Sequence, residues 1–159
     1  MSNRAFTSVE IAAGVAIVGS LLGVAVPAFI RNLHASHLTE ATAGLAKLQT
    51  GVLGVVETTG VAPAPAPLTP ALVARGARSV DAPGTWEHPT WRQLEFAPVP
   101  DGIAHAYSFS LDHDGADVVA RARGDLDGDG VTSLFEARVR TDGKAARLLP
   151  GLYVEAELE

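Results

Sequence analysis

One stretch of the sequence has the residue types and the spacing of a calcium-binding loop. Residues 124–136 are GDLDGDGVTSLFE, and the pattern D-x-D-x-D-G-x-x-S-x-x-E fits the twelve-residue calcium loop at every liganding position. Calcium prefers about six to eight hard oxygen ligands, and clustered aspartates repel one another unless a cation lies between them. The candidate ligands are the side chains of Asp125, Asp127, Asp129, Ser133 (through a water) and Glu136, with the carbonyl of Val131.

The segments on both sides of this loop favour strands, whereas an EF-hand needs two helices. Residues 116–121 and 131–140 have the apolar alternation of strands. We therefore expect an isolated calcium loop within a β-hairpin. In a strand Glu136 can point away from the loop, which would leave only the aspartates as ligands. A tight Asp/Gly turn without a metal is the alternative interpretation.

A second carboxylate borders a long apolar segment. Residues 11–30 are twenty consecutive uncharged, mostly apolar residues, and Glu10 precedes them within an apolar run that starts at Phe6. About 20 apolar residues cross a bilayer as a helix, and a carboxylate in such a helix points to a function. A cleaved secretory signal fits poorly, because the run is too long and no A-x-A site follows it. A plain membrane anchor fits the length but leaves Glu10 unexplained.

The start of the chain combines residues 5–10 (AFTSVE) and the apolar stretch behind them with Gly19 and Pro27 further along that stretch. With these residues in register, the N-terminal segment resembles the class III leader and first helix of type IV pilins and pseudopilins. In that family a prepilin peptidase removes a short basic leader before a phenylalanine. The new N-terminus is methylated, and a glutamate lies five residues into the mature chain. One departure is Ala5, which stands where the family usually has glycine.

The resemblance implies a structural subunit of a type IV pilus-like filament. Cleavage between Ala5 and Phe6 would create a methylated amine on Phe6, and Glu10 would pair with that amine of a neighbouring subunit. Because only one axial stagger satisfies both charges, the pair would set the register of the filament. Gly19 offers a small surface for close helix packing, and Pro27 should kink or locally open the helix. Major pseudopilins of the family carry calcium in the head.

The resemblance also implies partners and a location. The expected partners are further copies in a homopolymer or other pilins in a mixed filament, a prepilin peptidase, an inner-membrane assembly platform, and membrane lipid before assembly. The expected location is the bacterial inner membrane and then an extracellular pilus or a periplasmic pseudopilus. One alternative is a pseudopilin of a type II secretion system. Another is a membrane-anchored calcium-binding module that does not polymerise.

Composition and motifs exclude several other classes. The net charge of −6 argues against a nucleic-acid-binding surface. Cysteine is absent, so the chain has neither disulfides nor thiolate metal sites. The sequence contains no Gly-rich phosphate loop, no metalloprotease helix motif and no G-x-S-x-G motif, so we expect a protein that is not an enzyme.

The elements that would position these residues form an α+β chain, in which a long N-terminal helix packs on a small antiparallel β head. The second part of the helix should be amphipathic, because its apolar residues recur at three- and four-residue spacing. These apolar residues are Leu38, Ala41, Leu45, Leu48, Val52 and Val55. The expected segments are a leader (1–5), a membrane or filament-core helix half (6–30), an amphipathic half (31–58), a Pro-rich connecting region (59–102) and the β head with the acidic loop (103–159).

Within the head we expect strands at 104–111, 117–123, 131–140 and 145–149, and a short helix at 71–76. Trp86 and Trp91 should cover the core; a carbohydrate-binding platform is the alternative. His34 and His37 lie one helical turn apart and are expected on a solvated helix face, with a shared metal as the alternative.

Overall fold

The computed structural model describes residues 7–156, and within 28–37 it describes the backbone only. The chain forms two compact units, residues 1–36 and 37–159. Helix α1 (Ser8–Thr59) contributes to both units, and the second unit also contains helix α2 (Pro89–Gln93) and a six-stranded sheet. The chain is therefore α+β, as expected. The expected cleavage site at Ala5 and Phe6 and the side chains of His34 and His37 lie outside the described part.

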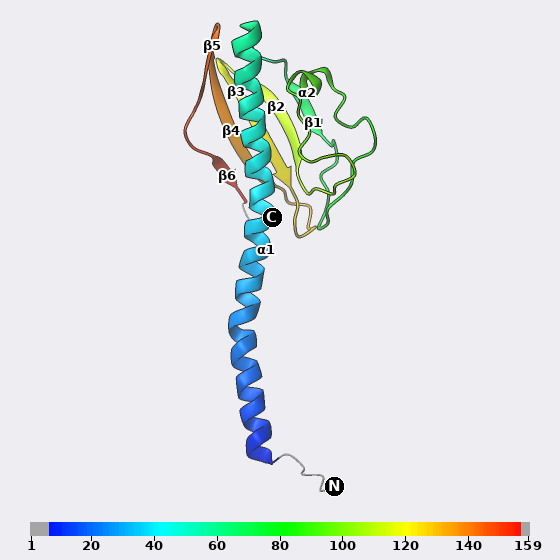
Figure 1. Ribbon diagram of the computed structural model, residues 1–159, viewed down its shortest axis with the longest axis vertical. Helices are drawn as coiled ribbons and strands as arrows, with labels where there is room; N and C mark the ends of the chain where they lie inside the picture. Colours follow the sequence, from blue (N-terminus) through cyan, green and yellow to red (C-terminus); the bar gives the residue numbers. More distant parts are fainter. Residues whose placement is uncertain (1–6, 157–159) are drawn as a thin grey trace. The chain divides into compact units, whose positions relative to one another are not determined.

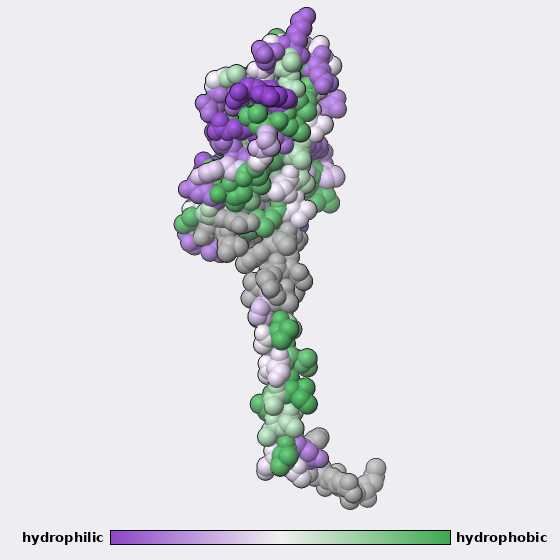
Figure 2. All heavy atoms as spheres, turned by 90° about the vertical axis from the view of Figure 1, so that its left-hand side faces the viewer, coloured by the Kyte–Doolittle hydropathy of each residue, from purple (hydrophilic) through white to green (hydrophobic). Residues whose placement is uncertain are grey.

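The first unit contains the apolar part of α1. The segment Ser8–Pro27 is long and apolar enough to cross a membrane, and its described side chains are all exposed. Figure 2 shows mostly hydrophobic residues along this stretch. The backbone is helical on both sides of Pro27, which lies inside α1. Such a helix is compatible with a membrane anchor or a signal sequence.

In the second unit, the rest of α1 lies across one face of the sheet (Figure 1). The helix ends at Thr59, within one residue of the expected end. Gly60 stops it with a left-handed φ of 72°, and the Gly60 N–H donates to the Val56 carbonyl at 2.8 Å. The expected apolar stripe faces the sheet. Its buried members are Ala41, Leu45, Leu48, Val52 and Val55, joined by Val56, while Leu38 is partly buried.

The named strands pair in antiparallel fashion in the order β1-β2-β3-β4-β5, and β6 also pairs with β4. Because β3 occupies one edge of β4, strands β5 and β6 share its other edge (Figure 1). The acidic loop, residues 125–132, joins β3 to β4. The strands are β1 (Ala66–Thr69), β2 (Ser108–Asp114), β3 (Asp117–Gly124), β4 (Ser133–Asp142), β5 (Ala145–Leu148) and β6 (Tyr153–Glu155).

The expected strands at 104–111, 117–123, 131–140 and 145–149 correspond to β2, β3, β4 and β5, with ends that differ by a few residues. Strands β1 and β6 were not expected. β1 lies inside the Pro-rich connecting region and pairs at the edge of the sheet, where the missing N–H of a proline is tolerated. β6 has only three residues, too few for a sequence pattern.

The prediction of a helix at 71–76 is wrong. Residues 75 and 79 of this region form isolated β-bridges with Asp125 and His105, which requires a locally extended backbone. The helix of the region is instead α2, which begins with Pro89 in its first turn, while the side chain of His88 accepts a hydrogen bond from the Thr90 N–H. Six residues without strong caps cannot hold a helix against such tertiary pairings.

Both tryptophans cover the core, as expected. Trp91 is fully buried, and its Nε1 donates to the Thr69 hydroxyl at 2.9 Å. Trp86 is half-buried and packs on Trp91 and Phe96, with ring centroids 5.8 and 5.5 Å away. A carbohydrate platform made of both rings is excluded, because Trp91 has no exposed surface. The region expected to connect helix and head therefore contributes to the same core as the sheet.

The helix and the sheet approach each other closely at Gly44. A Cβ on this residue would overlap Cε1 and Cζ of Phe109, a fully buried ring on β2 that cannot move away. We expect Gly44→Ala to destabilise the protein. Overpacking of the core costs about 1–3 kcal/mol, whereas alanine gains only roughly 1 kcal/mol over glycine in a helix.

Gly54 is the matched control on the same helix, because it is exposed and a Cβ there would have no neighbour within 4 Å. Gly54→Ala should stabilise the protein by about 1 kcal/mol. Unfolding of the full chain in mild detergent, followed by tryptophan fluorescence, measures both changes. Stabilisation by both variants would show that the helix does not approach Phe109 as described.

Candidate functional site

Glu10 closes a hydrogen-bonded cap at the start of α1. Its Oε2 accepts hydrogen bonds from the Thr7 N–H at 2.7 Å and from the Thr7 hydroxyl at 2.9 Å. In return, the Glu10 N–H donates to Thr7 Oγ1 at 3.3 Å. This reciprocal arrangement is a capping box, with Thr7 as N-cap and Glu10 three residues later. The T-x-x-E spacing could have indicated this role from the sequence.

The cap uses one oxygen of the Glu10 carboxylate. Within the described residues, Oε2 receives both bonds from Thr7, and no hydrogen bond or ion pair reaches Oε1. The helix dipole also stabilises the negative charge of a carboxylate at a helix N-terminus. The carboxylate is therefore held in a fixed place at the edge of the apolar helix, with one oxygen able to accept from another molecule.

The acidic loop brings its three aspartates together. One carboxylate oxygen from each of Asp125, Asp127 and Asp129 lies within 4.8 Å of the others, so the cluster can hold a metal ion. Positive φ angles of 84° at Gly128 and 98° at Gly130 produce the tight turn. Gly130 was expected to permit this turn; Gly128 was not identified from the sequence.

Backbone N–H groups support the loop from within. Asp125 is buried and accepts from the N–H groups of Gly128 at 2.7 Å and Gly130 at 3.1 Å. Asp127 accepts from the N–H of Asp129, and Asp129 from that of Val131. In the described residues these two exposed aspartates each keep a second carboxylate oxygen without a hydrogen bond. The loop thus forms a tight turn by itself while still presenting oxygens to a cation.

Two expected calcium ligands are not brought to this cluster. Glu136 lies within β4, and its two oxygens accept from Arg121 Nε at 2.9 Å and from Arg138 Nε at 2.8 Å. Ser133 is fully buried as the first residue of β4, and its hydroxyl donates to the Gly124 carbonyl at 3.1 Å. Because the chain continues as a strand after the loop, it cannot curl back to supply the last ligand as a helix does in an EF-hand.

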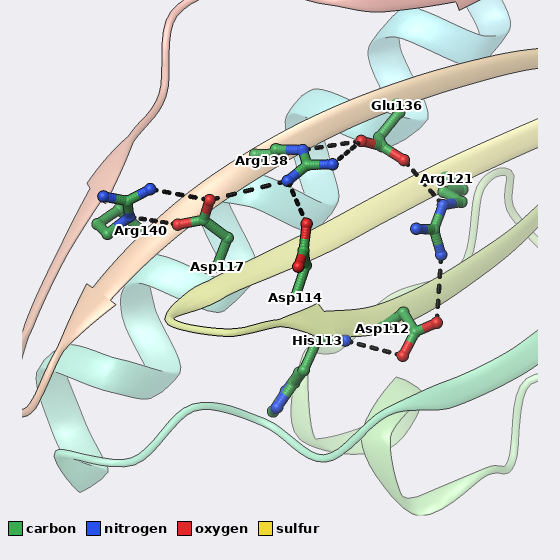
Figure 3. A network of polar contacts seen from close by, with 8 residues as sticks. All are labelled: Asp112, His113, Asp114, Asp117, Arg121, Glu136, Arg138 and Arg140. Carbon is green, nitrogen blue, oxygen red and sulfur yellow. Dashed lines mark hydrogen bonds and ion pairs between the residues drawn. The ribbon is translucent and has the colours of Figure 1, made fainter.

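Glu136 belongs to a network of ion pairs on the sheet face that lies opposite α1 (Figure 3). A hydrogen bond from Arg140 lowers the pKa of Asp117, with further help from nearby arginine charges. The His113 N–H, and then Arg121, lower the pKa of Asp112. These charges are paired within the chain. The network contains Asp112, Asp114, Asp117 and Glu136 with Arg121, Arg138 and Arg140.

Glu40 joins α1 to the sheet, a role the sequence did not suggest. Its side chain is 10% exposed, and Oε1 accepts from the backbone N–H groups of Ala106 at 2.7 Å and Tyr107 at 3.1 Å. Its other oxygen accepts from Arg78 at 2.9 Å. Nothing in the spacing identifies this role, because Glu40 lies beside the apolar stripe where a solvated glutamate would also lie.

Arg78 belongs to a segment, residues 75–81, that also contacts the acidic loop. The Gly76 N–H donates to the Asp125 carbonyl at 2.8 Å, and Arg75 Nε lies 3.9 Å from Asp125 Oδ2. Gly76 and Gly128 pack closely, since a Cβ on Gly128 would lie 3.4 Å from Gly76 Cα. The acidic loop is thus fixed to the rest of the α+β body on one side.

Comparisons of the chain with protein-family models, with curated proteins and with solved structures found no match. Function therefore has to follow from two local features, the capped carboxylate at the start of the apolar helix and the three converging aspartates.

Proposed function

We propose that the chain is a structural subunit of a type IV pilus-like filament that polymerises through its N-terminal helix. The observation that carries this proposal is the position of Glu10, a carboxylate fixed at the edge of an apolar helix with Oε1 free among the described contacts. In lipid or in a filament core such a charge requires a cationic partner. The described part of the apolar helix offers none, because Ser8–Pro27 contains no lysine or arginine.

The proposed partner is the N-terminal amine of a neighbouring copy. Cleavage between Ala5 and Phe6 creates that amine on Phe6, four residues before Glu10. Each subunit would therefore carry both halves of the pair at one end of its helix. The capping box survives cleavage because Thr7 remains in the chain. The exposed apolar surface of Ser8–Pro27 would be covered first by lipid and then by the helices of other copies.

Co-expression tests this proposal. We expect filaments, visible by electron microscopy, when the chain is produced with an active prepilin peptidase and an assembly platform, and none when the peptidase is inactive. Filaments that form equally well without cleavage would contradict the proposal. A role as a pseudopilin of a type II secretion system uses the same chemistry, and secretion of a substrate in place of extended pili would distinguish it.

A second proposal concerns the acidic loop, and it is supported by the convergence of Asp125, Asp127 and Asp129. We propose that these aspartates bind Ca²⁺, with the Val131 carbonyl and water completing the oxygen ligands. Glu136 is not a ligand in this proposal because both its oxygens are paired with arginines. The ion would neutralise three clustered negative charges and fix the loop between β3 and β4.

A calcium titration of the full chain, followed by thermal unfolding, tests this second proposal. At a calcium concentration ten times the Kd, we expect about 1.4 kcal/mol of stabilisation, which corresponds to a rise in Tm of roughly 3–6 °C. Asp127→Asn should abolish the calcium-dependent rise. Glu136→Gln is the matched control and should keep it, although this variant starts from a lower stability. No rise at millimolar calcium would contradict calcium binding.

A further inference from the structure

The α+β body has a pocket of about 640 Å³ formed entirely by residues 80–103. This segment lies beyond the β1 edge of the sheet, together with α2 (Figure 1). Trp86 lines the pocket and is held rigidly, because its Nε1 donates to Asp81 Oδ2 at 2.6 Å. The same oxygen lies 2.7 Å from Nε2 of buried His105. The pocket wall is therefore preorganised.

The pocket is acidic. Three carboxylates line it, Asp81, Glu87 and Asp101, and no lysine or arginine does. Asp81 is already engaged by His105 and Trp86, whereas Glu87 and Asp101 make no ion pair among the described residues and are exposed. An exposed pair of carboxylates in a pocket suits an ammonium or guanidinium group, because opposite charges attract.

The opposite edge of the sheet carries the complementary charge. The hairpin of β4 and β5 presents Lys144 and Arg147, both exposed and without an ion pair among the described residues, beside one exposed carboxylate, that of Asp142. Figure 1 shows β5 and the 80–103 segment on opposite sides of the body. Figure 2, which views the β5 side, shows hydrophilic side chains gathered on the upper part of that side. One edge thus has a pocket with two exposed, unpaired carboxylates, and the other has two exposed cations and one carboxylate.

We propose that the β4–β5 hairpin of one copy docks into the 80–103 pocket of the next copy. The occupant is a second copy because the two complementary surfaces lie on opposite edges of one body. A contact between two different surfaces of identical subunits is heterologous, and repetition of such a contact builds an open helical assembly. This inference rests on the proposed filament function and assigns a lateral contact to it, with Lys144 and Arg147 facing Glu87, Asp101 and Trp86.

Cysteine cross-linking of the full chain in the membrane tests the contact. The natural chain has no cysteine, so only introduced pairs can form disulfides. We expect Asp101→Cys with Lys144→Cys to give a ladder of dimers and larger species under mild oxidation, since a heterologous contact propagates. Val131→Cys with Lys144→Cys is the control, because Val131 is exposed but lies in the acidic loop. A yield for the 101/144 pair no higher than this control would overturn the inference.

Charge reversal in the variant with cysteines at positions 101 and 144 tests whether opposite charges hold the contact. Glu87→Lys alone and Arg147→Glu alone should each lower the cross-linking yield severalfold, and the two together should restore it. High salt should also lower the yield of the unreversed pair. Equal yields for all these variants would contradict a charged contact.

The outcomes also separate this inference from the proposed function. Filaments that depend on Glu10 but lack the 101/144 cross-link would overturn only the lateral contact. Cross-linking by a chain that has been cleaved before Phe6 but forms no filaments with the assembly platform present would support the contact and overturn the filament function.

Discussion

Replacing Glu10 with glutamine should abolish filament assembly while leaving the chain in the membrane. Glutamine keeps the shape of the side chain and can still close a capping box, because Glu and Gln both serve at that position. It removes only the charge. A neighbour's N-terminal ammonium would then lie unpaired in an apolar environment, and loss of one partner of such a pair is strongly unfavourable. We expect filament yield to fall by about two orders of magnitude or more.

Two further variants separate charge from capping. Thr7→Ala removes the hydroxyl that bonds to Glu10 but keeps the carboxylate, so it should weaken assembly far less than Glu10→Gln. Glu10→Ala removes both functions and should resemble Glu10→Gln. Electron microscopy and the filament fraction recovered by shearing measure all three. If Glu10→Gln polymerises normally and Thr7→Ala does not, then Glu10 serves as a cap, and the intersubunit pair is wrong.

Replacing Glu40 with alanine should cause the largest loss of stability that we predict. The side chain accepts from two buried N–H groups, those of Ala106 and Tyr107, where β2 is about to begin. Without Glu40 both donors lose their acceptor inside the body. Each unsatisfied donor costs about 1–3 kcal/mol, which gives a total of about 2–6 kcal/mol. Since the free energy of unfolding of a typical domain is about 5–15 kcal/mol, this loss is a large fraction of the total stability.

Glu40→Gln is the control for this prediction. Its amide oxygen can still accept both N–H bonds, while the charge that faces Arg78 is lost. We expect Glu40→Gln to retain most of the stability, because Arg78 is itself partly exposed and its ion pair is worth little. Denaturant unfolding of the full chain in detergent measures both variants. A loss below about 0.5 kcal/mol for Glu40→Ala would mean that these bonds do not hold α1 to the sheet.

The sequence predicts the elements whose patterns are long. The stripe from Leu38 to Val55 identifies the buried face of α1, and Gly60 marks its end. The alternation of the central strands identifies the sheet. These patterns are reliable because many residues share one period, and burial of apolar surface then follows from geometry.

What the sequence does not predict depends on contacts between distant residues. Glu40 bonds to a backbone 66 residues away, and segment 75–81 is extended because it pairs with other loops rather than with itself. Neither of these contacts produces a periodic pattern in the sequence. In the acidic loop, spacing predicts the three aspartates, which converge. It wrongly includes Ser133 and Glu136 in the cluster, because the strand that follows the loop directs them to other partners.

The mass of the intact chain, isolated from membranes of cells that contain a prepilin peptidase, tests the central claim most directly. The intersubunit pair needs an amine that exists only after residues 1–5 have been removed. We predict a single species with the mass of residues 6–159 plus one methyl group, with fragmentation placing that methyl on the Phe6 nitrogen. A chain that retains Met1, or one cut at another residue, would contradict the proposed role of Glu10 and the filament built on it.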